Sequence, residues 1–129
     1  MDAISLYQPW AWALFHGKPV ENRNWWTAFR GPLLIHAAKK YDNDGAWWIF
    51  ENKEKLGLPM ITVEYLLSRP VGALVGKVEM VDCVKNYDSP WFFGPYGHVY
   101  RNPKEFKTPI PYRGRQFPFK VEDEVLNEV

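Results

Sequence analysis

The segment Gly17-Lys18-Pro19-Val20-Glu21-Asn22-Arg23 places three ionisable side chains of mixed sign within six consecutive positions. Residues 20–26 alternate between apolar and polar side chains, which predicts a half-buried strand. On such a strand Glu21 and Arg23 share one face, so the carboxylate can orient the guanidinium, and Lys18 lies at the strand entrance. These charges form either a surface lysine with a structural ion pair or a site that meets a ligand.

Short helices and strands are expected on both sides of this segment. Pro9 suits the first position of a helix over residues 10–15, which Gly17 ends. Thr62, and one of the polar residues at 42–44, can cap two further helices, over 42–55 and 62–67. Strands are expected over 3–6, 33–37, 71–84, 97–101 and 117–121, an aromatic-rich flap over 86–97, an extended segment with little strand pairing over 102–114, and a short helix or frayed end over 122–128.

The length and composition predict one domain spanning residues 1–129, and the mixture of expected helices and strands makes its class α+β. The chain is 47% hydrophobic, which is enough for one core, and its formal net charge of +1 demands no polyanionic partner. Cys83 is the only cysteine, so no intrachain disulfide can form, and a reducing, cytoplasmic location is expected. No stretch approaches the ~20 apolar residues of a membrane span, and no cluster of metal ligands is evident. We therefore expect no membrane association, no metal and no cofactor.

Several motifs together resemble a known family. Gly17, Lys18, Glu21 and Arg23 reproduce a GxKxxExR-type signature with one residue fewer between Gly and Lys. Residues 4–11 (ISLYQPWA) and 30–37 (RGPLLIHA) flank it, and the Gly- and Pro-containing stretches over 94–114 complete the pattern. The chain resembles the ASCH domain family over nearly its whole length. This resemblance implies a PUA-like mixed β-barrel with surrounding helices, and a cleft beside the first helix where the signature residues gather.

The resemblance also implies a nucleic-acid or nucleotide ligand for that cleft. ASCH domains are generally inferred to bind RNA, and the neighbouring YTH and EVE families hold modified bases in aromatic-lined pockets. Lys18 would meet a phosphate or polarise a carbonyl, Glu21 would accept a base-edge proton or act as a general base, and Arg23 would orient Glu21 or clamp a phosphate. The expected partner is RNA or a modified nucleoside, with single-stranded DNA as an alternative.

Five further residues are candidates for ligand contact: Gln8, Trp10, Trp25, His36 and Lys39. Trp10 could equally be a core residue, and Trp25 and Trp26 face opposite ways, so one can be core while the other lines the cleft or lies exposed. A histidine in an apolar strand is more often a satisfied core residue than a ligand contact, but the family motif includes His36. Lys39 could extend a phosphate track or form a solvated strand end.

Two other segments have open interpretations. The flap aromatics, together with the adjacent His98, could close over a ligand or cover the core; they are Trp91, Phe92, Phe93 and Tyr96. The stretch from 101 to 120 has six cations and one acid, which suits either a phosphate-backbone contact or a solvated extended segment. The cations are Arg101, Lys104, Lys107, Arg113, Arg115 and Lys120.

The alternative function is a small metal-free hydrolase. Lys18 and Glu21 could serve as acid and base on RNA, as in a ribonuclease, or on an acylated nucleoside, as in an amidohydrolase. The ASCH-like amidohydrolase subgroup has a Thr three positions after the Lys, where this chain has Glu21. The sequence therefore departs from that subgroup and follows the wider family pattern. A protein-interaction domain is a third possibility, which the flap aromatics could support.

Overall fold

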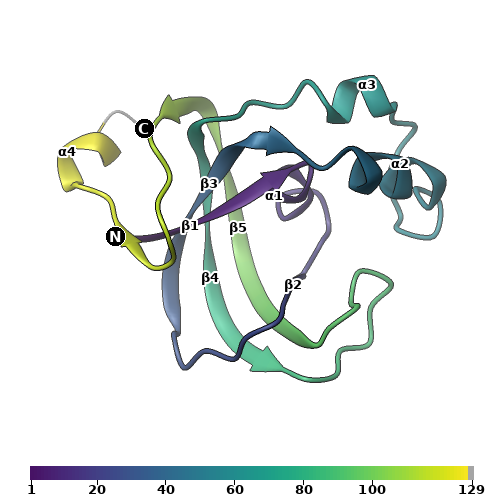
Figure 1. Cartoon of the computed structure of the whole chain (residues 1–129), viewed down its shortest axis with the longest axis horizontal. Coiled ribbons are helices and arrows are strands. Elements are labelled where there is room, and N and C mark those ends of the chain that lie inside the picture. The colour runs from purple at the N-terminus through teal and green to yellow at the C-terminus, as the bar shows by residue number, and fades with distance from the viewer. Residues whose placement is uncertain (128–129) are drawn as a thin grey trace.

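Six strands form one curved, mixed sheet in the computed structural model, which describes residues 1–127 (Figure 1). The strands lie in the order β2-β5-β4-β3-β1-β6, with β1 and β3 parallel and every other neighbouring pair antiparallel. Their bounds are β1 Asp2–Gln8, β2 Val20–Arg23, β3 Gly31–Tyr41, β4 Ala73–Val84, β5 Tyr96–Pro111 and β6 Phe119–Lys120. The α+β class is thus confirmed.

The sheet is open, which corrects the expected closed barrel. Over residues 1–127 no ladder joins β2, at one end of the sheet, to β1 or β6 at the other. β2 has only four residues. One side-chain hydrogen bond joins β2 to β1, in which Arg23 Nη2 donates to the Ser5 carbonyl over 3.3 Å. The curvature of the sheet therefore brings β2 near β1 without pairing the two strands.

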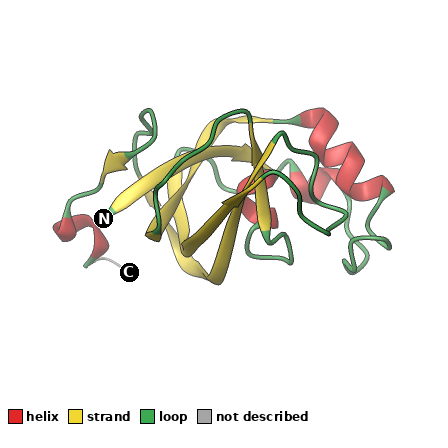
Figure 2. Ribbon diagram, turned by 90° about the horizontal axis from the view of Figure 1, so that it is seen from below, coloured by secondary structure: helices red, strands yellow, loops and turns green. Residues whose placement is uncertain are grey.

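Within the described residues four short helices accompany the sheet: α1 Trp10–Ala13, α2 Asn43–Glu51, α3 Val63–Leu66 and α4 Asp123–Leu126. The α2 and α3 helices lie at one end of the molecule and α4 at the other, with the curved strands between them (Figures 1 and 2). The side chains of Asp42 and Thr62 cap α2 and α3, as predicted. Pro9 is the N-cap residue of α1, one position earlier than predicted.

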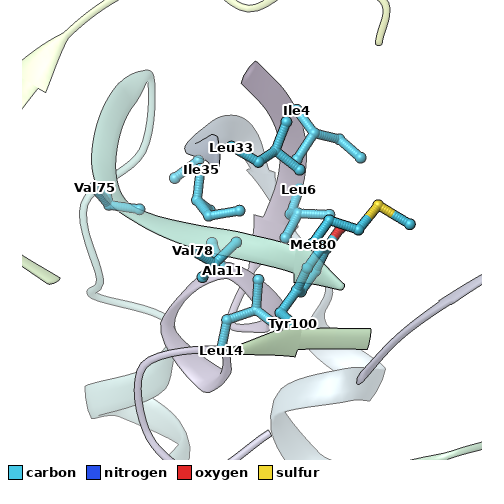
Figure 3. Close-up of a cluster of buried hydrophobic side chains, with 11 residues drawn as sticks. Ile4, Leu6, Ala11, Leu14, Leu33, Ile35, Val75, Val78, Met80 and Tyr100 are labelled. Atoms are coloured by element: carbon cyan, nitrogen blue, oxygen red, sulfur yellow. The ribbon is translucent and has the colours of Figure 1, made fainter. Parts of the chain in front are cut away.

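The main core lies between α1 and the sheet. Ala11 and Leu14 pack with apolar side chains of β1, β3, β4 and β5, and Figure 3 shows them gathered with strand residues such as Val78. A second cluster joins Trp12 to Ile49 of α2 and to Trp91 of the flap. This packing holds α1 in place, and α1 in turn positions the residues that follow it.

β5 continues to Pro111, through most of the segment over 102–114 where little strand pairing was predicted. The register between β4 and β5 shifts between Leu74 and Gly76 and between Lys77 and Glu79. Pro103 and Pro109 fall within these interruptions, so neither has to donate a ladder hydrogen bond. The prolines therefore bend β5 and do not end it.

Candidate functional site

Lys18 and Glu21 form a buried ion pair just after α1. Gly17 turns the chain with a φ of 104°, and the Lys18 amide donates to the Ala13 carbonyl over 3.0 Å. Lys18 Nζ then bonds Glu21 Oε1, and the two residues are only 3% and 7% exposed. Lys18 Nζ also lies 4.9 Å from the centre of the Trp10 ring. Burying two charges is costly, so a pair fixed in this way suggests a role other than stability.

These two residues border an open cavity of about 530 Å³, which we call the Lys18 pocket. Its aromatic walls are Trp10 of α1, Trp48 of α2 and Phe93 of the flap. The ring centres of Trp48 and Phe93 are 5.2 Å apart, and the two rings meet edge to face. Trp10 Nε1 donates to Asp42 Oδ2 over 2.8 Å, so the residue that caps α2 also orients this ring. The lining residues are Trp10, Lys18, Glu21, Asn22, Asp42, Asp44, Gly45, Trp48 and Phe93.

Two neighbours of Lys18 and Glu21 shape the Lys18 pocket. Asn22 anchors the flap, because its Oδ1 accepts from the amides of Phe93 and Gly94 over 2.8 and 3.0 Å, and its Nδ2 donates to the Trp91 carbonyl. A Cβ at Gly45 would lie 2.6 Å from the Trp10 ring, so only glycine lets α2 approach this closely. The aromatic walls are therefore held by specific contacts.

Arg23 does not share this pocket. We expected Glu21 to orient it, but the carboxylate bonds Lys18, and among residues 1–127 no ion pair joins Glu21 to Arg23. Arg23 and Trp25 border a separate cavity of about 350 Å³, with the guanidinium 6.0 Å from the Trp25 ring. Trp25 packs on Phe117 and lines this cavity, not the Lys18 pocket, whereas its neighbour Trp26 is exposed.

His36 and Lys39 border a third cavity, of about 1060 Å³. His36 Nε2 lies 2.6 Å from the Tyr112 carbonyl, which can only accept, so Nε2 is the donor. In the neutral ring Nδ1 is then the acceptor, and the Ser5 hydroxyl donates to it over 2.8 Å. Burial lowers the pKa of His36, and the hydrogen bond to Tyr112 opposes that shift.

Gln8 faces a fourth cavity, away from the Lys18 pocket. Its Nε2 donates to the Pro70 carbonyl over 2.9 Å, and its Oε1 accepts from the Trp12 amide over 2.9 Å. Both ends of the side chain thus hold α1 against the rest of the domain. The predicted site residues therefore divide: the structure brings Trp10, Lys18 and Glu21 together and places the others elsewhere.

A buried polar group, which the sequence grouped with the flap aromatics, lies on β5 opposite Glu21 of β2. His98 is fully buried, with Nε2 3.3 Å from the Trp25 carbonyl, and its Nδ1 has no partner among the described residues. Burial lowers the pKa of His98, and the neighbouring Arg23 charge adds to the shift. Burial also raises the pKa of the Tyr100 hydroxyl. The charged residues of β2, Glu21 and Arg23, therefore lie beside a part of β5 whose polar side chains are buried from water.

The buried histidines make stability depend on pH. An unfolded histidine titrates near its ordinary value of 6.5, whereas folding lowers the pKa values of His36 and His98. The unfolded chain therefore takes up protons first, and the free energy of unfolding should fall as the pH drops below about 6.5. His98→Gln should reduce that slope by at most about 1.4 kcal/mol per pH unit, measured by urea unfolding between about pH 7.5 and 5.5. Parallel curves for the two proteins would contradict this assignment.

Several residues of the Lys18 pocket were missed because no local pattern identifies them. Trp48 was expected only as part of the helix over 42–55, and Asp42 only as a possible cap of that helix. They reach Lys18 because α2 packs against Trp10, a contact between residues far apart in the chain. The flap aromatics do not all have the same position. Trp91 is buried in the second cluster and covers the core, whereas Phe93 is exposed and lines the pocket.

The fold and this pocket define a small α+β domain with an open, curved sheet and an aromatic site behind its first helix. The ASCH domain profile matches residues 4–116, and the chain belongs to the ASCH family, which is PUA-like. It is similar to "Activating signal cointegrator 1" of Homo sapiens and of Mus musculus, at 29% identity over 136 aligned residues in each case. The alignment covers 95% of this chain but only 22% of either relative, so the chain spans about a fifth of their length.

The described residues lack two kinds of feature. Among residues 1–127 no helix has the length and apolar character needed to cross a membrane. The same residues contain no group of three or more His, Cys, Asp or Glu side chains placed to hold a metal ion.

Proposed function

We propose that this ASCH domain binds RNA or a nucleotide-like ligand by holding a single base in the Lys18 pocket. The observation that carries the proposal is the buried Lys18–Glu21 pair at the edge of an open, aromatic-walled cavity. Family membership supports it, because ASCH domains are generally associated with RNA. A base stacked on an aromatic ring and read at its edge by fixed polar groups is a common mode of single-strand recognition.

The polar groups of the pocket suit a base edge. Lys18 can donate to a carbonyl or ring nitrogen of the base, while Glu21, Asp42 and Asp44 offer acceptors for its amino and imino protons. With three carboxylates and one ammonium, the pocket does not favour a phosphate. This refines the expectation that Lys18 meets a phosphate. Because Lys18 is already paired with Glu21, we propose binding here and not catalysis.

Trp48→Ala should weaken the binding of uncharged nucleosides by about 5- to 150-fold, since stacking on an aromatic ring contributes roughly 1–3 kcal/mol per base. Isothermal titration with the four nucleosides and with a single-stranded RNA would measure it, and a DNA strand of the same sequence would test the choice of sugar. Trp47→Ala is the matched control, because Trp47 precedes Trp48 on α2, is 53% exposed and does not line the pocket. Equal losses in the two variants, or none in Trp48→Ala, would disprove the proposed base site.

A further inference from the structure

A second concave surface on the domain has the opposite charge from the Lys18 pocket. The cavity that contains Arg23 and the cavity that contains His36 share three lining residues, so together they form one continuous surface. We call it the basic groove. The shared residues are Ser5, Arg115 and Gln116.

All the charged side chains that line the basic groove are cationic. They are Arg23, Lys39, Arg113 and Arg115, and no carboxylate lines either cavity. Among residues 1–127 none of the four takes part in an ion pair. Arg115 does influence Glu122, whose pKa it helps to lower, but that carboxylate lies outside the groove and accepts from Tyr112 Oη over 2.8 Å. In a chain with a net charge of +1, this is a concentrated positive surface.

The groove is built against a fixed floor. Ser5 and His36 lie opposite each other in the β1–β3 ladder and are joined by their 2.8 Å hydrogen bond. A Cβ at Gly114 would lie 2.5 Å from Ser5 Oγ and 2.7 Å from His36 Cε1, so only glycine lets this segment lie directly on that floor. Gly114 thereby holds its two neighbours, Arg113 and Arg115, at the groove.

Arg23 shows that the groove has unused hydrogen-bonding capacity. One guanidinium nitrogen donates to the Ser5 carbonyl, while the buried Nε has no partner among the described residues. A buried guanidinium N–H without an acceptor is costly, and a phosphate oxygen in the groove can accept from it once Arg23 shifts to expose Nε.

We propose that the basic groove binds the phosphodiester backbone of a nucleic-acid strand, a role that rests on the proposed base binding in the Lys18 pocket. The division of charge supports this assignment, because the acidic, aromatic pocket suits a base and the cationic groove suits phosphates. Several cations spread along two joined cavities match a chain of phosphates better than one phosphate group. The strand therefore contacts the domain at two places of opposite charge.

The test is the salt dependence of RNA binding by the full chain. Fluorescence anisotropy of a labelled uridine oligonucleotide of about 12 nucleotides would be followed from about 50 to 300 mM KCl. We expect the triple variant Lys39→Gln/Arg113→Gln/Arg115→Gln to have a less steep salt dependence. The negative slope of log K against log[salt] should become smaller in magnitude by about 2, since each phosphate contact in a single strand contributes roughly 0.7. At about 0.1 M salt the same relation gives a loss of about 100-fold in affinity.

A second triple variant controls for general charge. Lys55→Gln/Lys85→Gln/Arg101→Gln removes an equal number of positive charges from exposed positions that line neither the Lys18 pocket nor the basic groove. We expect its slope to match that of the unaltered protein. An equal reduction in both triples, an unchanged slope in the groove triple, or no oligonucleotide binding at all would overturn the groove. Competition by polyglutamate as effective as by unlabelled RNA would overturn it too, in favour of an acidic protein partner.

Failure of the groove and failure of the base site give different results. Uncharged nucleosides have no phosphate, so the groove triple should bind them as well as the unaltered protein does, whereas Trp48→Ala should not. Inorganic phosphate and a mononucleotide separate a single phosphate site from a strand. If either binds in the groove as tightly as the oligonucleotide, the backbone assignment is wrong.

Discussion

Glu21→Leu is expected to lower the free energy of unfolding by about 3–5 kcal/mol, because it leaves the buried ammonium of Lys18 without its counter-charge. Lys18→Met should cost a similar amount by leaving the carboxylate alone. The double variant Lys18→Met/Glu21→Leu should recover most of the loss, since replacing a buried pair by apolar side chains of similar volume is often close to neutral. Urea unfolding of all four proteins completes the cycle.

The controls separate this buried pair from an ordinary surface pair. Lys120 bonds Asp2 over 2.7 Å but is 80% exposed, so Lys120→Met should change stability by less than about 1 kcal/mol. If the double variant instead loses the sum of the two single effects, then Lys18 and Glu21 act independently and the pair is not a unit.

The same double variant connects stability with function. A folded double variant keeps the aromatic walls of the Lys18 pocket but lacks the two groups proposed to read a base edge. It should therefore retain stability and lose the discrimination among nucleosides. Unchanged discrimination would leave stacking as the only contribution of the pocket and would remove Lys18 and Glu21 from the proposed site.

The local part of the site could be predicted from the sequence. The G-K-x-x-E pattern placed Lys18 and Glu21 together because they are close in the chain, and the motifs identified the family. The pairing itself was not predicted, because alternation on a strand favours Arg23 as the partner of Glu21. Lys18 is the partner of Glu21 because Gly17 turns the chain, which places the Lys18 side chain against the Trp10 ring.

The distant part of the site could not be predicted. Trp48 and Phe93 reach the Lys18 pocket through packing between α2, α1 and the flap, which depends on contacts such as Gly45 against Trp10. The open sheet was not predicted for a similar reason, because strand patterns predict curvature but do not reveal whether the two ends of a sheet will pair. A four-residue β2 is too short for its spacing alone to decide that question.

Gly76→Ala is expected to lower the free energy of unfolding by roughly 2–3 kcal/mol, because it overpacks the contact between the curved sheet and Phe15, in the turn that follows α1. A Cβ there would lie 2.4 Å from Phe15 Cζ and 2.6 Å from the Lys104 carbonyl oxygen. Gly76 is also where the β4–β5 register shifts, so the missing side chain lets β5 and the end of α1 approach the same bend. The neighbouring exposed Lys77→Ala, measured in the same urea titration, should cost less than about 0.5 kcal/mol.

The cause of this loss can be resolved by a second substitution. Gly76→Ala/Phe15→Leu removes the ring tip but leaves the Lys104 carbonyl, which is backbone and cannot turn away. If the ring dominates, the double variant should be more stable than the sum of the single effects predicts, and if the carbonyl dominates, the two effects should add. A Gly76→Ala protein as stable as the unaltered one would show that β4 can shift at this bend. The close approach of α1 that positions Lys18 would then not depend on glycine.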